Sequence, residues 1–354
     1  MAYTTIDDPT IYFNTVLYTG NGNTGHAITG VGFQPDLVWL KCRPQARNNR
    51  LIDVIRGVGK HLESDNTDAE ESPSSGLTAF GSDGFTVGDT GGYNNSSENF
   101  VAWNWKAGTS FTNDASSTGI GTIDSAGSFN NDSGFSIVSY TGNNTSGATL
   151  KHGLNTAPAM VIVKNRNRTD NRDWVVYHQK LTSASYYIYL NSTAGQAGGS
   201  YAGFWNSTAP NSSVITLGSG DTSTNGSSDT YVAYCFAEKQ GYSKVGKYVG
   251  NGNADGTFVF CGFKPAFILQ KRIDSTSNWH IFDNKRETFN PQQRYLLPNA
   301  SDAEGNAGSW DFLSNGFKIR SSEAWQNNSG GTFIYMAFAE SPFVNSNGVP
   351  NNAR

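Results

Sequence analysis

The sequence predicts an all-β protein built from three tandem β-sandwich units of jelly-roll type. Three observations favour this class. One motif occurs three times, aromatic residues make up 13% of the chain while charged residues make up only 15%, and 40 glycines with many Ser, Thr and Asn residues separate short apolar runs. Aromatic and β-branched residues favour strands, and clusters of small polar residues mark turns. A disordered chain would lack the aromatic residues.

The repeated motif joins a glycine cluster to an apolar run that ends in lysine. The stretch "LYTGNGNTGHAITGVGFQPDLVWLK" starts at Leu17, and related stretches start at Ser139 and Lys247. The copies lie roughly 100 residues apart, which is the size of a small domain. Four residue types keep their register in all three copies: Tyr18, Tyr140 and Tyr248; Gly20, Gly142 and Gly250; Pro35, Pro158 and Pro265; Lys41, Lys164 and Lys271.

These spacings predict the domain organisation. Residues 1–108 form the first sandwich repeat, 135–240 the second, and 241–354 the third with a C-terminal tail. Residues 109–134 are rich in Gly, Ser and Asn, and we interpret them as a linker between the first two repeats.

Each copy contains segments typical of buried strands. The runs "DLVWLK", "AMVIVK" and "AFILQK" are short, apolar and entered through proline. The closing segment "TFIYMAFAES" is apolar on both faces, which predicts a strand between two layers. We interpret the glycine cluster of each copy as a hairpin turn, because a phosphate-binding loop would require a helix directly after it.

Composition excludes several classes of protein. The formal net charge is −4 and basic residues do not cluster, so we expect no nucleic-acid binding. Neither a signal peptide nor a membrane span is predicted, so we expect the chain to be made and folded in the cytoplasm without membrane insertion. Cys42, Cys235 and Cys261 lack disulfide or zinc spacing. We predict no cofactor and no metal.

Acidic residues recur in two of the three copies. Asp68 and Glu70 recur as Asp302 and Glu304, and the second copy lacks this element. The pair Asp53 and Arg56 likewise recurs as Asp283 and Arg286. A structural salt bridge and turn-capping acids explain the recurrence more simply than a glycosidase pair does, so we predict no catalytic residue. Whether Asp68/Glu70 and Asp302/Glu304 bind calcium or only cap turns stays open at this point.

Two tryptophans are candidates for ligand binding. Most tryptophans fall in or beside strands, where core packing is the simplest interpretation. Trp205 in "AGFWNSTAP" and Trp325 in "SSEAWQNNSG" are instead flanked by polar loop residues. They are therefore the two candidate platforms on which a sugar could stack.

Long motifs across almost the whole chain resemble a repeated domain found in structural proteins of tailed bacteriophages, especially marine and cyanobacterial phages. The resemblance is carried by stretches such as "ITGVGFQPDLVWLK", "LTAFGSDGFTVG", "YCFAEKQGYSKVGKYVGNGNADGTFV" and "YMAFAESPF". It implies a virion structural or tail fibre protein that assembles in the host cytoplasm. It carries over no catalytic or ligand-binding residue.

Three functional hypotheses follow. The first is a tail-associated fibre or adhesin that displays loops to a host cell-surface glycan. The alternative is a capsid decoration or tail-shaft protein without its own ligand, and the third is a polysaccharide depolymerase. We expect partners among other virion proteins and a homo-oligomer, with a trimer favoured.

Overall fold

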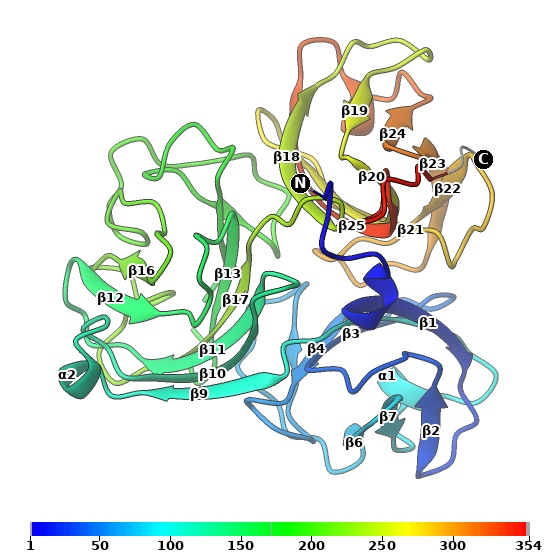
Figure 1. Cartoon of the computed structure of the whole chain (residues 1–354). Helices are drawn as coiled ribbons and strands as arrows, with labels where there is room; N and C mark the ends of the chain where they lie inside the picture. The colour runs from blue at the N-terminus through cyan, green and yellow to red at the C-terminus, as the bar shows by residue number, and fades with distance from the viewer. Residues whose placement is uncertain (1, 171, 352–354) are drawn as a thin grey trace.

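The computed structural model describes residues 2–170 and 172–351 and is nearly all β, with several antiparallel sheets (Figure 1). The predicted all-β class is therefore confirmed. Helices in this part of the chain are single turns, and none is long and apolar enough to cross a membrane. They are η1 (Pro9–Ile11), α1 (Gly91–Asn94), α2 (Ala115–Thr118) and α3 (Ala324–Asn327).

The first copy forms a larger and a smaller sheet. The larger has the order β1-β8-β3-β4-β5 and the smaller β2-β7-β6. Strands of the larger sheet are β1 (Phe13–Thr19), β3 (Leu37–Cys42), β4 (Arg50–Asp53), β5 (Leu62–Glu63) and β8 (Asn99–Trp105). Strands of the smaller sheet are β2 (His26–Thr29), β6 (Leu77–Gly81) and β7 (Gly84–Val87).

The second copy has a seven-stranded sheet, β15-β14-β13-β17-β11-β10-β9, and the two-stranded sheet β12-β16. The seven strands are β9 (Thr109–Asn113), β10 (Ser125–Asn130), β11 (Phe135–Thr141), β13 (Met160–Asn165), β14 (Val175–His178), β15 (Ile188–Tyr189) and β17 (Thr230–Phe236). The smaller sheet contains β12 (Ala148–Lys151) and β16 (Val214–Leu217).

The third copy contains the sheets β18-β25-β20-β21 and β19-β24-β23-β22. The first holds β18 (Ser243–Val249), β20 (Phe263–Arg272), β21 (Trp279–Asp283) and β25 (Thr332–Pro342). The second holds β19 (Phe258–Phe260), β22 (Gln292–Tyr295), β23 (Gly305–Leu313) and β24 (Gly316–Ile319). Residues 352–354 of the expected tail lie outside the described residues.

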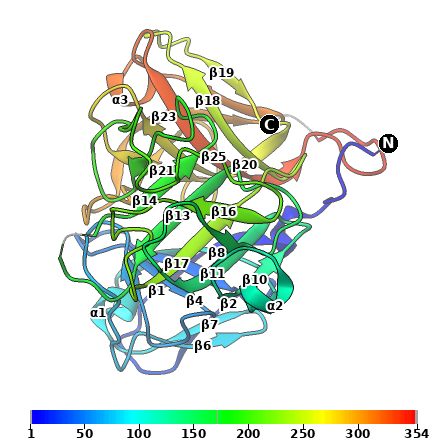
Figure 2. The same ribbon diagram turned by 90° about the vertical axis from the view of Figure 1, so that its left-hand side faces the viewer.

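One hydrophobic core is shared by all three copies. Trp103 and Trp105 of β8, Tyr234 of β17 and Phe338 of β25 belong to the same buried cluster. Three further clusters are local, each lying within one copy. The three sheets that contain the closing strands β8, β17 and β25 thus surround a common centre, and the other three sheets lie outside them (Figures 1 and 2).

The closing strands can serve two cores because both of their faces are apolar, as predicted. In β25, Ile334, Met336 and Phe338 belong to the shared core, while Phe333 and Tyr335 belong to the local core of the third copy. Strands of this kind must be covered on both faces, and the shared core and the local core cover the two faces of β25. Within its sheet, β25 pairs with β18 at one edge and with β20 at the other.

The expected linker at 109–134 is wrong, because this segment adds strands β9 and β10 to the sheet of the second copy. Strand β9 forms the edge of this sheet and β10 lies between β9 and β11, and polar residues are common on strands at a sheet edge. Phe111 and Phe129 are the aromatic residues that these strands pack against the local core. From the sequence alone, an edge strand with so few apolar residues cannot be distinguished from a linker.

The glycine clusters are not hairpin turns either. Strand β1 pairs with β8 and strand β2 pairs with β7, so the chain between them crosses from one sheet to the other. A Cβ on Gly20 would lie 2.2 Å from the carbonyl oxygen of Asn95, and Gly142 and Gly250 make equally close backbone approaches. Glycine recurs at this position because two backbone segments touch there.

The described ends of the chain meet on the third copy. Tyr3 donates from its hydroxyl to the carbonyl oxygen of Gly262 at 3.0 Å. The backbone N–H of Ser346 donates to the carboxylate of Asp7 at 2.6 Å. Figure 1 shows the first residues running beside β18 and β25.

Candidate functional site

The two candidate tryptophans have different environments. Trp205 is 2% exposed, lies in the local core of the second copy, and packs edge-on against Tyr177 at 6.0 Å between ring centroids. The expectation that its ring lies open on a loop is wrong, because the polar neighbours in sequence cover a buried side chain. Trp325 is half-buried in α3 and lines a cavity.

This cavity, which we call the Trp325 pocket, has a volume of about 380 Å³. That is at the small end of the range for ligand-binding sites. It lies at one end of the third copy, between the turn after β20, strands β21 and β22, and the turn that contains α3. Its lining residues are Arg272, Thr276, Ser277, Asn278, His280, Tyr295, Glu323, Ala324 and Trp325.

Aromatic rings form one wall of the pocket. The indole of Trp325 stacks on the imidazole of His280, with ring centroids 4.1 Å apart and planes 24° apart. Tyr295 lies against Trp325 at 5.4 Å, and Phe282 lies parallel to it at 6.3 Å. These contacts hold the indole in a defined orientation, as a stacking platform for a ligand requires.

Polar groups without partners complete the lining. Within the described residues, His280 Nδ1 and Ser277 Oγ are buried and have no hydrogen-bond partner. Asn278 accepts a bond from Asn299 at 2.8 Å through Oδ1, which leaves its Nδ2 group available as a donor. Burial, together with the Lys271 cation, lowers the pKa of His280 to about 3, so its imidazole is neutral at pH 7. Unpartnered buried polar groups are costly unless a ligand or water satisfies them.

The residues that form the pocket differ between the third copy and the first. Arg50 in the first copy corresponds to His280 in the third. Arg50 pairs with Leu40, which precedes Lys41, and His280 pairs with Gln270, which precedes Lys271. Gly92, two residues before Asn94, has the position of Trp325, two residues before Asn327. A Cβ on Gly92 would lie 1.8 Å from Arg50 Nη1, so the guanidinium fills the corresponding space.

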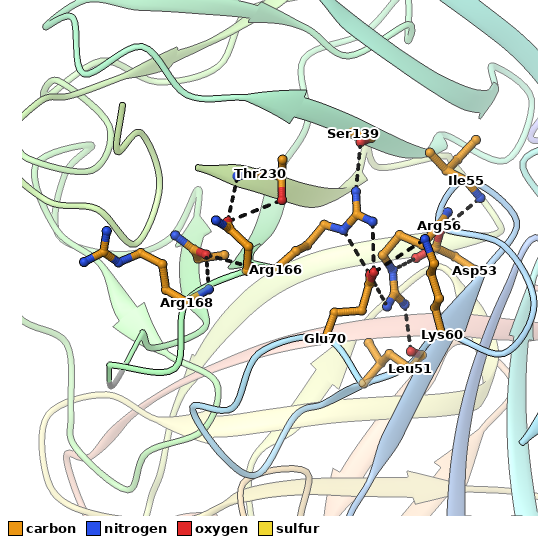
Figure 3. Close-up of polar contacts among 12 residues, drawn as sticks. Leu51, Asp53, Ile55, Arg56, Lys60, Glu70, Ser139, Arg166, Arg168 and Thr230 are labelled. Atoms are coloured by element: carbon orange, nitrogen blue, oxygen red, sulfur yellow. Dashed lines mark hydrogen bonds and ion pairs between the residues drawn. The ribbon is translucent and has the colours of Figure 1, made fainter. Parts of the chain in front are cut away.

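The recurring glutamates lie between copies, where arginines bind them. Glu70 pairs with Arg166 of the second copy through two bonds of 3.0 Å, and Arg56 approaches it at 3.3 Å (Figure 3). Arg56 also pairs with Asp53 at 2.6 Å, and both of these side chains are fully buried. Asp68 is exposed.

The third copy repeats the arrangement against the first. Glu304 pairs with Arg43 at 2.9 Å and with Arg286 at 3.0 Å, while Arg286 pairs with the buried Asp283. Asp302 is exposed, like Asp68. Both glutamates therefore bind guanidinium groups between copies. Among the described residues, no cluster of His, Cys, Asp or Glu suited to a metal ion is found.

The motif lysines are buried links between copies, a role that the sequence analysis missed. Lys41 donates to the carbonyl oxygens of Arg47 and Ser301. Lys164 and Lys271 do the same, each bonding once within its own copy and once to a neighbour, at Thr67 and Thr193 respectively. The order of contacts is cyclic: first to third, second to first, third to second. Recurrence of a lysine at the end of a buried strand was the available signal.

Together these features define an all-β protein whose repeated copies pack around one core and whose third copy carries an aromatic pocket in a place that Arg50 fills in the first copy. The chain belongs to the family described as Domain of unknown function (DUF7483), which matches residues 8–342. One family domain thus spans all three copies. Comparison with curated proteins and with solved structures finds no match.

Proposed function

We propose that the protein is a structural component of a tailed-bacteriophage virion, a tail-associated fibre or adhesin that binds a host cell-surface glycan in the Trp325 pocket. The supporting observation is the pocket itself, where an oriented indole lies beside unpartnered polar groups. Sugars present an apolar face of C–H groups and a rim of hydroxyls, which suits such a lining.

A binding role agrees better with the acidic residues than catalysis does. Glycoside hydrolysis needs two carboxylates on opposite sides of a sugar. Glu70 and Glu304 are instead engaged by arginines between copies, and Glu323 is the carboxylate at the Trp325 pocket. A depolymerase is accordingly the weakest of the three hypotheses.

The proposal includes an architecture and an assembly. Each copy, with two sheets about a local core, is proposed to be a jelly-roll-like β-sandwich unit. The chain is proposed to form a homotrimer with other virion proteins as neighbours. Because the sheets that contain β8, β17 and β25 already cover one another in the shared core, further chains must associate through outer surfaces. Light scattering at micromolar concentration tests this, and a monomer contradicts it.

Binding to host cells is the direct test of the adhesin function. Labelled wild-type protein should bind host cells or their extracted surface polysaccharide, and Trp325→Ala should lose that binding. Phe289→Ala is the matched control, since Phe289 is a 78% exposed aromatic residue of the same copy outside the pocket. Equal binding by the wild type and Trp325→Ala contradicts the proposal.

A capsid decoration or tail-shaft protein is the second candidate. It is favoured by the closed arrangement of the copies around one core, which makes a compact block and not an extended fibre (Figure 2). Imaging of virions that carry a tag on the C-terminus separates the two candidates. Label at the tail supports the adhesin, whereas label spread over the head supports decoration.

A further inference from the structure

We propose that the ligand of the Trp325 pocket is a neutral hexopyranose unit and not an acidic sugar. This inference rests on the proposed glycan-binding function and names the chemical class of the sugar.

The charges at the pocket disfavour an anionic ligand. Arg272 is the cation in the lining, and its guanidinium is already engaged, with Nε bonded to Asp274 at 2.8 Å and Nη1 bonded to the carbonyl oxygen of Ala324 at 3.4 Å. Only 15% of this side chain is exposed. Glu323 is exposed and forms no ion pair within the described residues. The unpaired charge at the pocket is therefore negative, and it would repel the carboxylate of a uronic or sialic acid.

The buried groups next to the pocket also offer no free cation. Lys271 lies behind the lining, and its ammonium bonds to the carbonyl oxygens of Thr193 and Ser277. His280 is 4% exposed and is neutral at pH 7, since burial lowers its pKa to about 3. A neutral imidazole can donate to or accept from a hydroxyl group, and it carries no positive charge to offset the negative charge of a carboxylate.

The remaining polar groups suit hydroxyls. Ser277 Oγ can both donate and accept, Asn278 Nδ2 can donate, and Glu323 can accept. The Trp325 indole and the Tyr295 ring supply the apolar surface against which the C–H face of a pyranose packs. A volume of about 380 Å³ suits a single ring more than a long oligosaccharide.

Saturation-transfer NMR on the full chain tests the class of sugar. The probes are the methyl hexopyranosides of glucose, galactose and mannose, and, as the acidic set, methyl glucuronoside and N-acetylneuraminic acid. At least one neutral glycoside should bind with an affinity about tenfold higher than either acidic sugar. Trp325→Ala should weaken that binding by about tenfold or more, and Phe289→Ala should leave it unchanged.

Two substitutions of Glu323 test the class of sugar without changing Trp325. Glu323→Ala should keep the fold, because this side chain is exposed, and should weaken neutral-sugar binding. Glu323→Lys should raise the affinity for methyl glucuronoside. Thermal melts of all variants confirm folding.

Each outcome supports or overturns the inference. Trp325-dependent binding that prefers acidic sugars overturns the neutral class and leaves the proposed adhesin function standing. Sugar binding that survives Trp325→Ala overturns the assignment to this pocket. Binding of no probe, together with no binding to host polysaccharide, overturns both proposals.

Discussion

At the scale of single residues, the glutamates that recur in two copies stabilise contacts between copies. Glu70 lies between Arg166 and the fully buried Arg56, and Glu304 lies between Arg43 and Arg286. The sequence left calcium binding or turn capping as alternatives, and neither describes these contacts. Recurrence revealed that the acids matter, but their partners come from distant parts of the chain.

Removing one of these acids should destabilise the fold strongly. In Glu70→Ala the guanidinium of Arg56 stays buried without this carboxylate, and Arg166 loses both of its bonds to it. We expect the free energy of unfolding to fall by about 3 kcal/mol. Asp68→Ala is the matched control, because Asp68 is exposed, and it should change stability by less than about 0.5 kcal/mol. Urea titrations check both, and equal effects would refute the assigned role of Glu70.

His178 should make the contact between the second and third copies sensitive to acid. Its Nδ1 accepts from the N–H of Lys180 at 3.1 Å, and its Nε2 donates to the carbonyl oxygen of Tyr335 at 3.2 Å. Both nitrogens are thus engaged in the neutral form. Burial lowers the pKa of His178 to about 4, below the ordinary value of 6.5.

The sign of the pH dependence follows from this shift. Between pH 6.5 and about 4 the unfolded chain binds a proton at this histidine that the folded chain does not, so stability falls as the pH falls. His178→Gln should reduce this loss by up to about 3 kcal/mol. Unfolding free energies measured from pH 7 to pH 4 for both proteins test it. Parallel curves for the two would show that His178 does not contribute.

At the scale of elements, the sequence predicted the strands with buried faces and missed the elements whose role depends on a partner. The apolar runs before Lys41, Lys164 and Lys271 are strands β3, β13 and β20, and the closing segments are β8, β17 and β25. Asp83 lies in the turn between β6 and β7, as the "SDGF" signal predicts. Alternation and turn chemistry are local, so they are readable from sequence.

The missed features depend on contacts between distant segments. Strands β9 and β10 are recognisable only once the sheet they join is known. The glycine crossing is held by a recurring asparagine, since the side chains of Asn94, Asn225 and Asn327 accept from the backbone N–H of Asn21, Asn143 and Asn251. In the candidate site, polar neighbours marked both Trp205 and Trp325, and only the surrounding packing separates the buried ring from the pocket wall.

The segment that crosses between the two sheets of the first copy should tolerate no side chain at Gly20. Gly20→Ala places a Cβ 2.2 Å from the Asn95 carbonyl oxygen, so the two segments must separate. We expect a loss of about 1–3 kcal/mol in unfolding free energy. Gly91→Ala is the control, because its nearest neighbour is 3.6 Å away and its φ is ordinary. Chemical denaturation measures both, and a Gly20→Ala protein as stable as the control would contradict the close approach.

At the scale of the whole molecule, the shared core implies that a copy does not fold alone. Residues 1–108 in isolation would expose Trp103 and Trp105, which the other copies cover. We expect this fragment to lack a cooperative thermal transition and to bind a hydrophobic dye, while the full chain melts cooperatively. Near-ultraviolet circular dichroism and dye fluorescence test this. A sharp melt of the fragment would mean that the local core suffices.

The meeting of the described ends on the third copy bears on the order of the copies. The lysine contacts run cyclically through the three copies, and Tyr3 and Asp7 bond to residues near the other end. A chain in which the same copies followed one another in a rotated order would keep these lysine contacts, because each contact depends on where the copies lie and not on which copy comes first. The observed order of copies along the chain is therefore one of several orders that could form the same ring of contacts between the three copies.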